Sequence, residues 1–401
     1  MNGQKGFSLI ELLVAMAVLI VVAAAAVTAL VQAQHVTTAV GLEANTQQNL
    51  RAGMHFIVHD LMQAGEGIPQ LGVTIPTTAG GVSNITRPGP PGIAAAAKFP
   101  ANYIALPQIT PGSLLGQDAK TVNPITGAVQ DGLLKTDITT ILYVDDTLVS
   151  SALGPGGIPA PKLSDYPVVQ LAPANPVCAG VLAVDGSSLT LAPACFTLPG
   201  TPVPIQKGDL IMFHNTRGSA LEMVTDVNVG AGVLTFAAGD PAGLNGTGLP
   251  NGTVTNLNVG ATPTDISRVW MVTYYVDSNT SPTRPQLIRQ VNYPNYPTAA
   301  APNYPPQPIA DIIENLSFSY DLINSNAPVG TYPLGPGDAA QPIAPDTPLN
   351  IRAVNVTLAG RSEYTYTARS SPQFFRNNLS TQVSVRSMAF VNAFPTPATL
   401  P

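Results

Sequence analysis

One carboxylate near the start of the chain needs a chemical explanation. The chain opens with six mostly polar residues, Met1 to Gly6, and an apolar run then extends from Phe7 to Val31. Glu11 is the fifth residue of that run, and no charged residue occurs from Leu12 to Leu30. A carboxylate in the hydrocarbon of a bilayer costs about 2.5–3.5 kcal/mol or more. The position of Glu11 therefore indicates that its charge has a function.

The residues around Glu11 resemble a known processing signal. The run G-F-S-L-I-E-L-L-V-A-M, residues 6–16, is similar to the signal of type IV prepilins and type II secretion pseudopilins. This resemblance implies that a prepilin peptidase cuts between Gly6 and Phe7 and that the new Phe7 amine is N-methylated. It also implies that the helix stays in the inner membrane until assembly. Glu11 would then pair with the Phe7 amine of a neighbouring subunit as a filament grows.

The apolar run has the properties that such a helix needs. Phe7–Val31 is 25 residues, or roughly 37 Å of helix, which is enough to span a bilayer. Small side chains that permit close helix packing recur along it: Ala15, Ala17, Ala23–Ala26 and Ala29. A secretory signal peptide or a plain single-span anchor are the alternatives. Both are disfavoured by Glu11, and the signal peptide also by the single basic residue, Lys5, before the run.

The two cysteines flank a predicted β-hairpin. Asp185-Gly186 is a turn signal between two apolar-rich runs, and Cys178 and Cys195 stand at the two ends of the segment. In an oxidising periplasm they are expected to form a disulfide that closes the hairpin. Two buried free thiols are the alternative. No nearby histidine or third cysteine completes a metal site.

The remaining chemical candidates are isolated in the sequence. His55 and His59 share a helix face at i, i+4 spacing, but no third zinc ligand is evident. Asp145-Asp146 follows a predicted strand and is expected to cap a turn, with a cation contact as the alternative, and His214 has no triad pattern around it. Neither G-x-S-x-G nor a P-loop motif occurs. No catalytic residue, metal or cofactor is predicted, and the protein is not expected to be an enzyme.

The composition indicates an exported, β-rich protein. Charged residues make up 10% of the 401 residues, against about 25% in typical domains. Hydrophobic residues make up 45%, which is ample for a core, and 35 glycines and 40 prolines provide turns. The formal net charge is −6, and no basic patch is present, so nucleic-acid binding has little support.

The elements that position these residues predict an α+β fold. No proline occurs from Phe7 to Ile68, and apolar residues recur at helical spacing from Leu50 to Met62. We expect one helix to about Ala64, with a membrane half and an amphipathic half packed on an antiparallel β-sheet head. Gly41 and Gly53 are candidate bending points.

Strands are predicted for most of the rest of the chain. Residues 69–136 read as loop-rich, Ile309–Glu314 as a short helical turn, and the Asn-Tyr-Pro repeats between Pro282 and Pro308 as an extended surface loop, or alternatively as a partner-binding strip. Asp209–His214, Ala220–Val227 and Val233–Ala237 read as a meander. The other predicted strands are Ile138–Val144, Val181–Val184, Leu189–Ala192, Arg268–Val276, Gln286–Val291, Leu316–Leu322, Leu349–Leu358 and Leu379–Val391.

The last third of the chain adds a second resemblance. The strand V-W-M-V-T-Y-Y-V, the segments P-Q-L-I-R and I-E-N-L-S-F-S-Y, and the strands I-R-A-V-N-V-T-L and S-T-Q-V-S-V-R-S-M-A-F follow in that order. This order is similar to PilW-like minor pilins and the related J-type pseudopilins. Five parts of the chain are then expected: a leader peptide (1–6), a transmembrane and assembly helix (7–31), its amphipathic half (32–68), a loop- and β-rich insertion with the disulfide hairpin (69–265) and the C-terminal β-sheet of the head (266–401).

The resemblance implies a non-catalytic minor pilin that assembles into, or primes, a type IV pilus. Its partners would be other pilins, the prepilin peptidase and the inner-membrane assembly platform. A pseudopilin of a type II secretion system is one alternative, and a tip subunit whose 69–265 insertion binds a receptor is another. Before assembly the chain would cross the inner membrane once, with its head in the periplasm. It would then join a surface pilus or a periplasmic pseudopilus.

Overall fold

The structure is a computed structural model, and it describes fifteen stretches of the chain. These are residues 8–93, 98–99, 103–145, 169–171, 180–191, 205–246, 249, 251–259, 262, 264–294, 296–298, 301–322, 331–332, 348–368 and 371–385.

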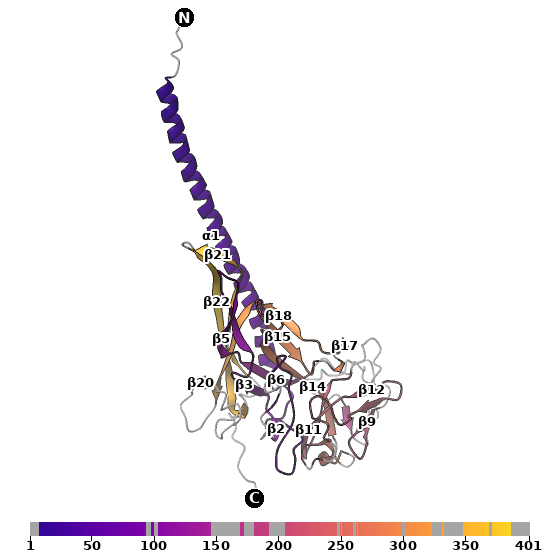
Figure 1. The fold of residues 1–401 in the computed structure, drawn as a ribbon. Helices are drawn as coiled ribbons and strands as arrows, with labels where there is room; N and C mark the ends of the chain where they lie inside the picture. Colours follow the sequence, from indigo (N-terminus) through magenta and orange to yellow (C-terminus); the bar gives the residue numbers. More distant parts are fainter. Residues whose placement is uncertain are drawn as a thin grey trace, which may run out of the picture.

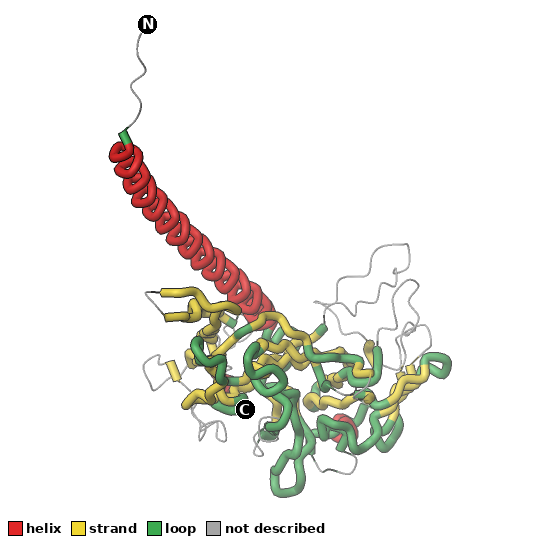
Figure 2. Tube along the Cα trace, turned by 45° about the horizontal axis from the view of Figure 1, so that its top comes forward, coloured by secondary structure: helices red, strands yellow, loops and turns green. Residues whose placement is uncertain are grey.

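One long helix projects from a head built of strands. Helix α1 (Leu9–Gln63) has 55 residues, or roughly 80 Å at 1.5 Å per residue. Its N-terminal part extends away from the head, and the strands gather around its other end (Figures 1 and 2). The buried residues of α1 begin at Thr46. The expected α+β architecture, a long apolar helix packed on antiparallel sheets, is confirmed.

The largest sheet is organised around one central strand, β14 (Thr264–Asp277). Along one edge β14 pairs with β10 and then β15, and along the other with β7 and then β6, all antiparallel. Strands β11, β18 and β3 complete the eight-stranded sheet. The bounds of the seven other strands are β3 (Ile109–Gly112), β6 (Ile138–Val144), β7 (Val169–Leu171), β10 (Leu210–Asn215), β11 (Gly218–Met223), β15 (Gln286–Val291) and β18 (Gln307–Asp311).

A second sheet of four strands carries the C-terminal part of the described chain. Its order is β20-β19-β21-β22, with bounds β19 (Ile313–Leu322), β20 (Thr331–Tyr332), β21 (Ile351–Ala368) and β22 (Ser371–Ser384). Helix α1 lies against both this sheet and the large one. Residues on the sheet face of α1, among them Leu50, Met54, Ile57 and Leu61, enter one hydrophobic cluster with both sheets.

The smaller elements lie mostly between α1 and β14 in the sequence. A third sheet has the order β12-β13-β9-β8. Its strands are β8 (Gly180–Leu182), β9 (Ser188–Leu191), β12 (Asp226–Asn228) and β13 (Val233–Thr235). Three two-stranded sheets and two short 3-10 helices complete the described elements: β1 (Val73–Thr74) with β2 (Ala105–Leu106), β4 (Asp118–Val122) with β5 (Val129–Lys135), β16 (Pro297–Thr298) with β17 (Ala301–Pro302), η3 (Val254–Leu257) and η5 (Pro348–Asn350).

Two predicted elements around residues 209–314 are wrong. The helical turn at Ile309–Glu314 is the passage from β18 to β19, and Ile312 between them has a φ of 57°. The residues on both sides of Ile312 are in strands, and the left-handed backbone of Ile312, which β-branched residues rarely adopt, marks where the chain changes sheet. The predicted meander is also divided. Strands β10 and β11 pair in the large sheet, whereas β12 and β13 pair with each other and β13 with β9 in the small sheet.

The Asn-Tyr-Pro tract differs from the surface loop predicted for it. Tyr293 is only 4% exposed and belongs to a hydrophobic cluster under the large sheet. Tyr304 packs edge-to-face on Trp270, with ring centroids 5.6 Å apart. The prolines keep the backbone extended, and the tyrosines anchor it to the head.

Gly53 contributes close packing to α1. A Cβ at this position would lie 2.9 Å from Leu287 Cδ2 and 3.0 Å from the Ala310 Cβ, whereas a Cβ at Gly41 would meet nothing within 4 Å. The helix is continuous through both glycines. Gly53 therefore lets the helix approach β15 and β18 closely.

Candidate functional site: the N-terminal helix and its attachment

The first turn of α1 is closed by two of its own side chains. The Ser8 backbone N–H donates to Glu11 Oε2 at 3.0 Å, and the Ile10 N–H donates to Ser8 Oγ at 3.4 Å. This is a capping box, in which the carboxylate also stabilises the positive end of the helix dipole. The Ser8-x-x-Glu11 spacing is the sequence signal for it, and sequence reasoning missed it. Gly6 and Phe7 lie outside the described residues.

The segment that follows Glu11 presents apolar side chains all round. From Leu9 to Val31 each described residue is exposed. In the described part of the chain α1 is the one helix that is long and apolar enough to cross a membrane. The single subunit thus leaves this surface uncovered, and a bilayer or other apolar helices would cover it.

A buried ion pair attaches the other end of α1 to the large sheet. Asp60 is 1% exposed. Arg289 of β15 donates to it through Nε at 2.7 Å and through Nη2 at 3.1 Å. The hydroxyls of Tyr143 and Tyr274 also donate to the Asp60 carboxylate, Tyr143 at 3.3 Å. Helix and sheet are therefore joined by a charge-assisted, two-point contact with two further donors. We call Asp60, Arg289, Tyr143 and Tyr274 the Asp60 clamp.

The three partners of Asp60 in the clamp come from three adjacent strands. Tyr274 on β14 lies directly opposite Arg289 on β15 in the ladder, and β6, with Tyr143, flanks β14 on its other edge. Burial and the nearby Asp60 charge raise the pKa of both tyrosines, so both stay protonated as donors. Burial lowers the pKa of Arg289, but the hydrogen bond to Asp60 and the Coulomb attraction of Asp60, Tyr274 and Tyr143 together outweigh this, and the pKa is raised.

Sequence reasoning missed the clamp, although a signal for it exists. Asp60 is one of the polar residues that lie between apolar ones in this part of α1. It stands three residues after Ile57 and directly before Leu61, at the border of the buried stripe. A carboxylate on such a border indicates a buried cationic partner, because an unpaired charge there would be costly.

A second charged cluster lies farther along the same sheet. Arg268 on β14 donates to Asp145 Oδ2 through Nε at 2.8 Å and to Asp209 Oδ2 through Nη1 at 3.2 Å. The guanidinium also lies 4.6 Å from the centroid of the Trp270 ring. Burial raises the pKa of Asp209, and Arg268 acts in the opposite direction. Asp145 thus pairs with a cation supplied by the protein itself, and Asp146 lies outside the described residues.

The other candidates from the sequence do not converge on one site. His55, His59 and His214 are exposed, and His59 Nδ1 is 3.5 Å from Asp60 Oδ1. Among the described residues no three metal-ligating side chains come together. The predicted hairpin is present, with β8 paired to β9. Cys178 and Cys195 lie outside the described residues.

Comparison with known proteins gives one finding. The family model for the prokaryotic N-terminal methylation motif matches residues 1–27. No curated protein and no solved structure matches the chain. The motif supports a type IV prepilin-like protein, a class processed by prepilin peptidase and assembled with other pilins, and it favours a structural role. Together with the apolar half of α1, it fits an inner-membrane anchor that carries a periplasmic head.

Proposed function

We propose that this protein is a PilW-like minor pilin that joins or primes a type IV pilus. One observation carries the proposal: a methylation motif at residues 1–27 leads directly into an uncovered apolar helix that projects from a β-rich head (Figure 1). After cleavage between Gly6 and Phe7, the helix leaves the bilayer and packs among other pilin helices. Glu11 then pairs with the N-methylated Phe7 amine of a neighbour. The Asp60 clamp holds the head in one orientation on this helix.

The processing step is tested by the mass of the mature protein. The chain is purified from membranes that contain a prepilin peptidase, and its N-terminal peptide is sequenced by tandem mass spectrometry. We expect the peptide to begin with methylated Phe7. A mature chain that begins near Ala33 or later would show that the apolar segment is a cleaved secretory signal, and the pilin proposal would fail.

The filament that it enters is tested separately. Surface filaments are sheared from cells, and the protein is sought by antibody in the sheared fraction. Its presence there supports a pilus subunit. Its confinement to the periplasm and inner membrane, with a secretion defect on deletion, would support the alternative of a type II secretion pseudopilin.

A third function, receptor binding by the 69–265 insertion of a tip subunit, has one observation in its favour. A separate hydrophobic cluster is built from residues between Leu189 and Ile266, and it supports the small sheet. Val181 and Val184 of the β8–β9 hairpin are exposed apolar residues on this sheet. Replacing both with Ser would reduce attachment of cells to surfaces, with filaments unchanged, if the hairpin contacts a receptor.

A further inference from the structure

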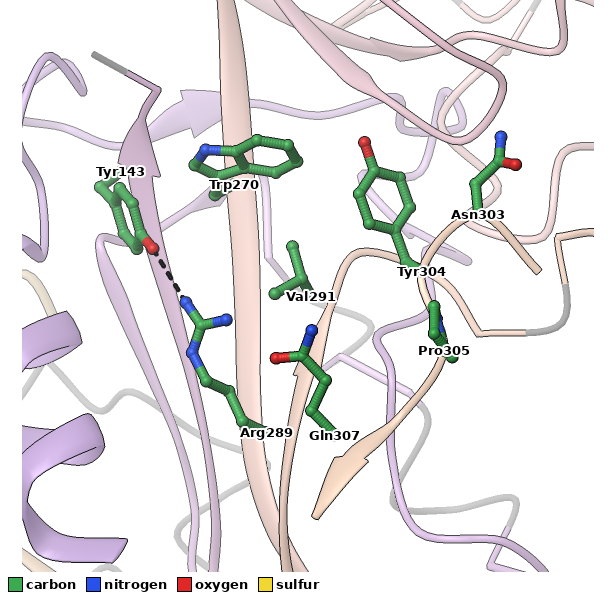
Figure 3. Close-up of a pocket in the computed structure, with 8 residues that line it drawn as sticks. All are labelled: Tyr143, Trp270, Arg289, Val291, Asn303, Tyr304, Pro305 and Gln307. Atoms are coloured by element: carbon green, nitrogen blue, oxygen red, sulfur yellow. Dashed lines mark hydrogen bonds between the residues drawn. The ribbon is translucent and has the colours of Figure 1, made fainter. Parts of the chain in front are cut away.

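A pocket of about 250 Å³ opens on the head beside the Asp60 clamp. It lies on the large sheet, between Tyr143, Trp270 and Arg289 on one side and the segment that leads into β18 on the other (Figure 3). Its described lining is Tyr143, Trp270, Arg289, Val291, Asn303, Tyr304, Pro305 and Gln307. Asp60, the helix residue to which Arg289 and Tyr143 of the lining donate, is 29 residues after Val31, or roughly 45 Å along α1. The pocket is therefore well outside the membrane-length segment.

Several polar atoms around the pocket are not used by the described part of the chain. Arg289 donates through Nε and Nη2 to Asp60, and through Nη2 also to Tyr143. Its other terminal nitrogen points toward Val291 and Gln307 (Figure 3). Asn303 donates through Nδ2 to the Lys207 carbonyl at 2.6 Å, which leaves its amide oxygen as an acceptor. The Gln307 amide and the Trp270 indole N–H make no hydrogen bond within the described residues. The lining of the pocket thus carries both donors and acceptors that the described residues do not use.

The charges around the pocket are already balanced. Asp60 neutralises Arg289, and Asp145 and Asp209 together exceed the charge of Arg268 behind Trp270. A carboxylate or phosphate ligand would find no unpaired cation in the described lining, and Coulomb attraction would contribute little to its binding. The lining instead favours a neutral molecule.

The apolar part of the lining specifies the shape of that molecule. Trp270 and Tyr304 meet edge-to-face, and Val291 and Pro305 lie beside them (Figure 3). Aromatic rings and prolines present flat apolar surfaces to which C–H groups can pack. The volume is below the roughly 300 Å³ at which pockets for drug-sized ligands begin. A single ring with apolar faces and a rim of hydroxyls satisfies all of these conditions.

We propose that this pocket binds one neutral hexose unit of a glycan. The C–H face of the sugar would pack on the aromatic rings. Its hydroxyls would bond to the free Arg289 nitrogen and the Gln307 amide, which lie next to each other (Figure 3). The proposal is independent of the filament assignment, because it depends only on the head.

The chain contains its own reporter for this proposal. Trp270 is the single tryptophan of the sequence, so intrinsic tryptophan emission reports on the pocket alone. The full-length protein is held in a zwitterionic detergent, since maltoside or glucoside detergents carry the proposed ligand. D-glucose, D-galactose and D-mannose are titrated separately, with glycerol at matched hydroxyl concentration as the solvent control. We expect saturable quenching or enhancement with at least one hexose and none with glycerol.

Gln307→Ala is the informative variant, because the side chain is exposed and makes no hydrogen bond within the described residues. Loss of one hydrogen bond is expected to weaken binding about three- to tenfold. The matched control is Gln373→Ala, an exposed glutamine on β22, which should leave binding unchanged. No saturable change with any of the three hexoses would overturn the proposal. So would equal binding by the two variants, or a response to acetate or inorganic phosphate that exceeds the response to hexoses.

Discussion

Asp60 of α1 and Arg289 of β15 are 229 residues apart in the sequence and form a two-point ion pair at 2.7 and 3.1 Å. The pair fixes the rotation of the helix about its axis relative to the large sheet, because the carboxylate must face the guanidinium and two tyrosine hydroxyls at once. In a filament subunit this contact would set how the head sits on the helix that is held in the filament core. Removing either charge should therefore affect both stability and the orientation of the head.

Asp60→Asn is expected to lower the free energy of unfolding by about 3–5 kcal/mol, since it leaves the Arg289 charge buried and unpaired. Because asparagine keeps the shape of the side chain, the loss of unfolding free energy measures the effect of removing the charge. Denaturant unfolding of the full-length protein in detergent measures it. The matched control is Asp131→Asn, an exposed carboxylate paired with Lys120, for which less than about 1 kcal/mol is expected. Equal losses in the two variants would show that the clamp carries no special stability.

Glu222 makes stability depend on pH in the direction opposite to most carboxylates. Burial raises its pKa to about 8, against its ordinary 4.5, with Asp240 adding to the rise. Between about pH 4.5 and 8 the Glu222 carboxyl is therefore protonated in the folded state and ionised in the unfolded state. By linkage this contribution to stability is present below about pH 4.5 and is lost as the pH rises toward 8. Above the folded-state pKa of about 8, Glu222 is ionised in both states, and its effect on the free energy of unfolding no longer changes with pH.

Replacing Glu222 with Gln removes this titration. The amide oxygen can still accept the Val254 N–H bond that the carboxylate accepts. Relative to the parent protein, Glu222→Gln should gain stability steadily from about pH 5 to pH 8, as measured by the free energy of unfolding in a pH series. A difference between the two proteins that stays constant over this range would contradict the raised pKa.

Sequence patterns predicted the parts of the fold that depend on local periodicity. The absence of proline to Ile68 and the apolar spacing from Leu50 predicted the helix and its end, and alternation predicted β19 and the first part of β21. Which strand lies beside which depended on long-range pairing. Strand β14 has four neighbours, and three of them, β6, β7 and β10, come from the 69–265 region, outside the last third of the chain that carries the second resemblance. Local patterns cannot specify such partners.

The site was predictable at one end of the helix and not at the other. Glu11 attracts attention because its surroundings in the sequence are apolar on both sides. Asp60 stands between His59 and Leu61, where polar and apolar residues alternate in the sequence, and its burial depends on partners that lie 83 to 229 residues later. The pocket likewise depends on Trp270 and Gln307 meeting across strands. Ion pairs and pockets of this kind are set by tertiary packing, which a single sequence shows only indirectly.

Gly53→Leu is expected to destabilise the head, because even a Cβ would lie about 3 Å from Leu287 and Ala310. Overpacking of this kind costs about 1–3 kcal/mol or more. Gly41→Leu is the matched control: no atom lies within 4 Å of its Cβ, and leaving glycine favours the helix by up to about 1 kcal/mol. Thermal unfolding should show a lower midpoint for the first variant and an equal or higher one for the second. A rise for both would mean that Gly53 is not a packing position.

Cys178 and Cys195 are expected to form a disulfide in protein isolated from the periplasmic side of the membrane. The β8–β9 ladder pairs Gly180 with Leu191, so the two chain ends that lead to the cysteines leave the hairpin together. Intact mass measured without and with a reducing agent should differ by two hydrogens. Alkylation before reduction should label neither cysteine. Labelling of both without reduction would show two free thiols instead.

Glu11→Gln separates the charge of this residue from its part in the capping box. Glutamine also serves at the third helix position of a capping box, so the bond from the Ser8 N–H can be kept while the negative charge is lost. If Glu11 neutralises the Phe7 amine of a neighbour, the variant should remain in the membrane but enter filaments poorly beside wild-type subunits, because that amine would then be buried without a counter-charge. Glu43→Gln, which removes an exposed carboxylate from the same helix, should assemble normally. The measurement is the fraction of each tagged variant in sheared filaments relative to membranes. Normal assembly of Glu11→Gln would refute a role for its charge and leave the capping box as its contribution.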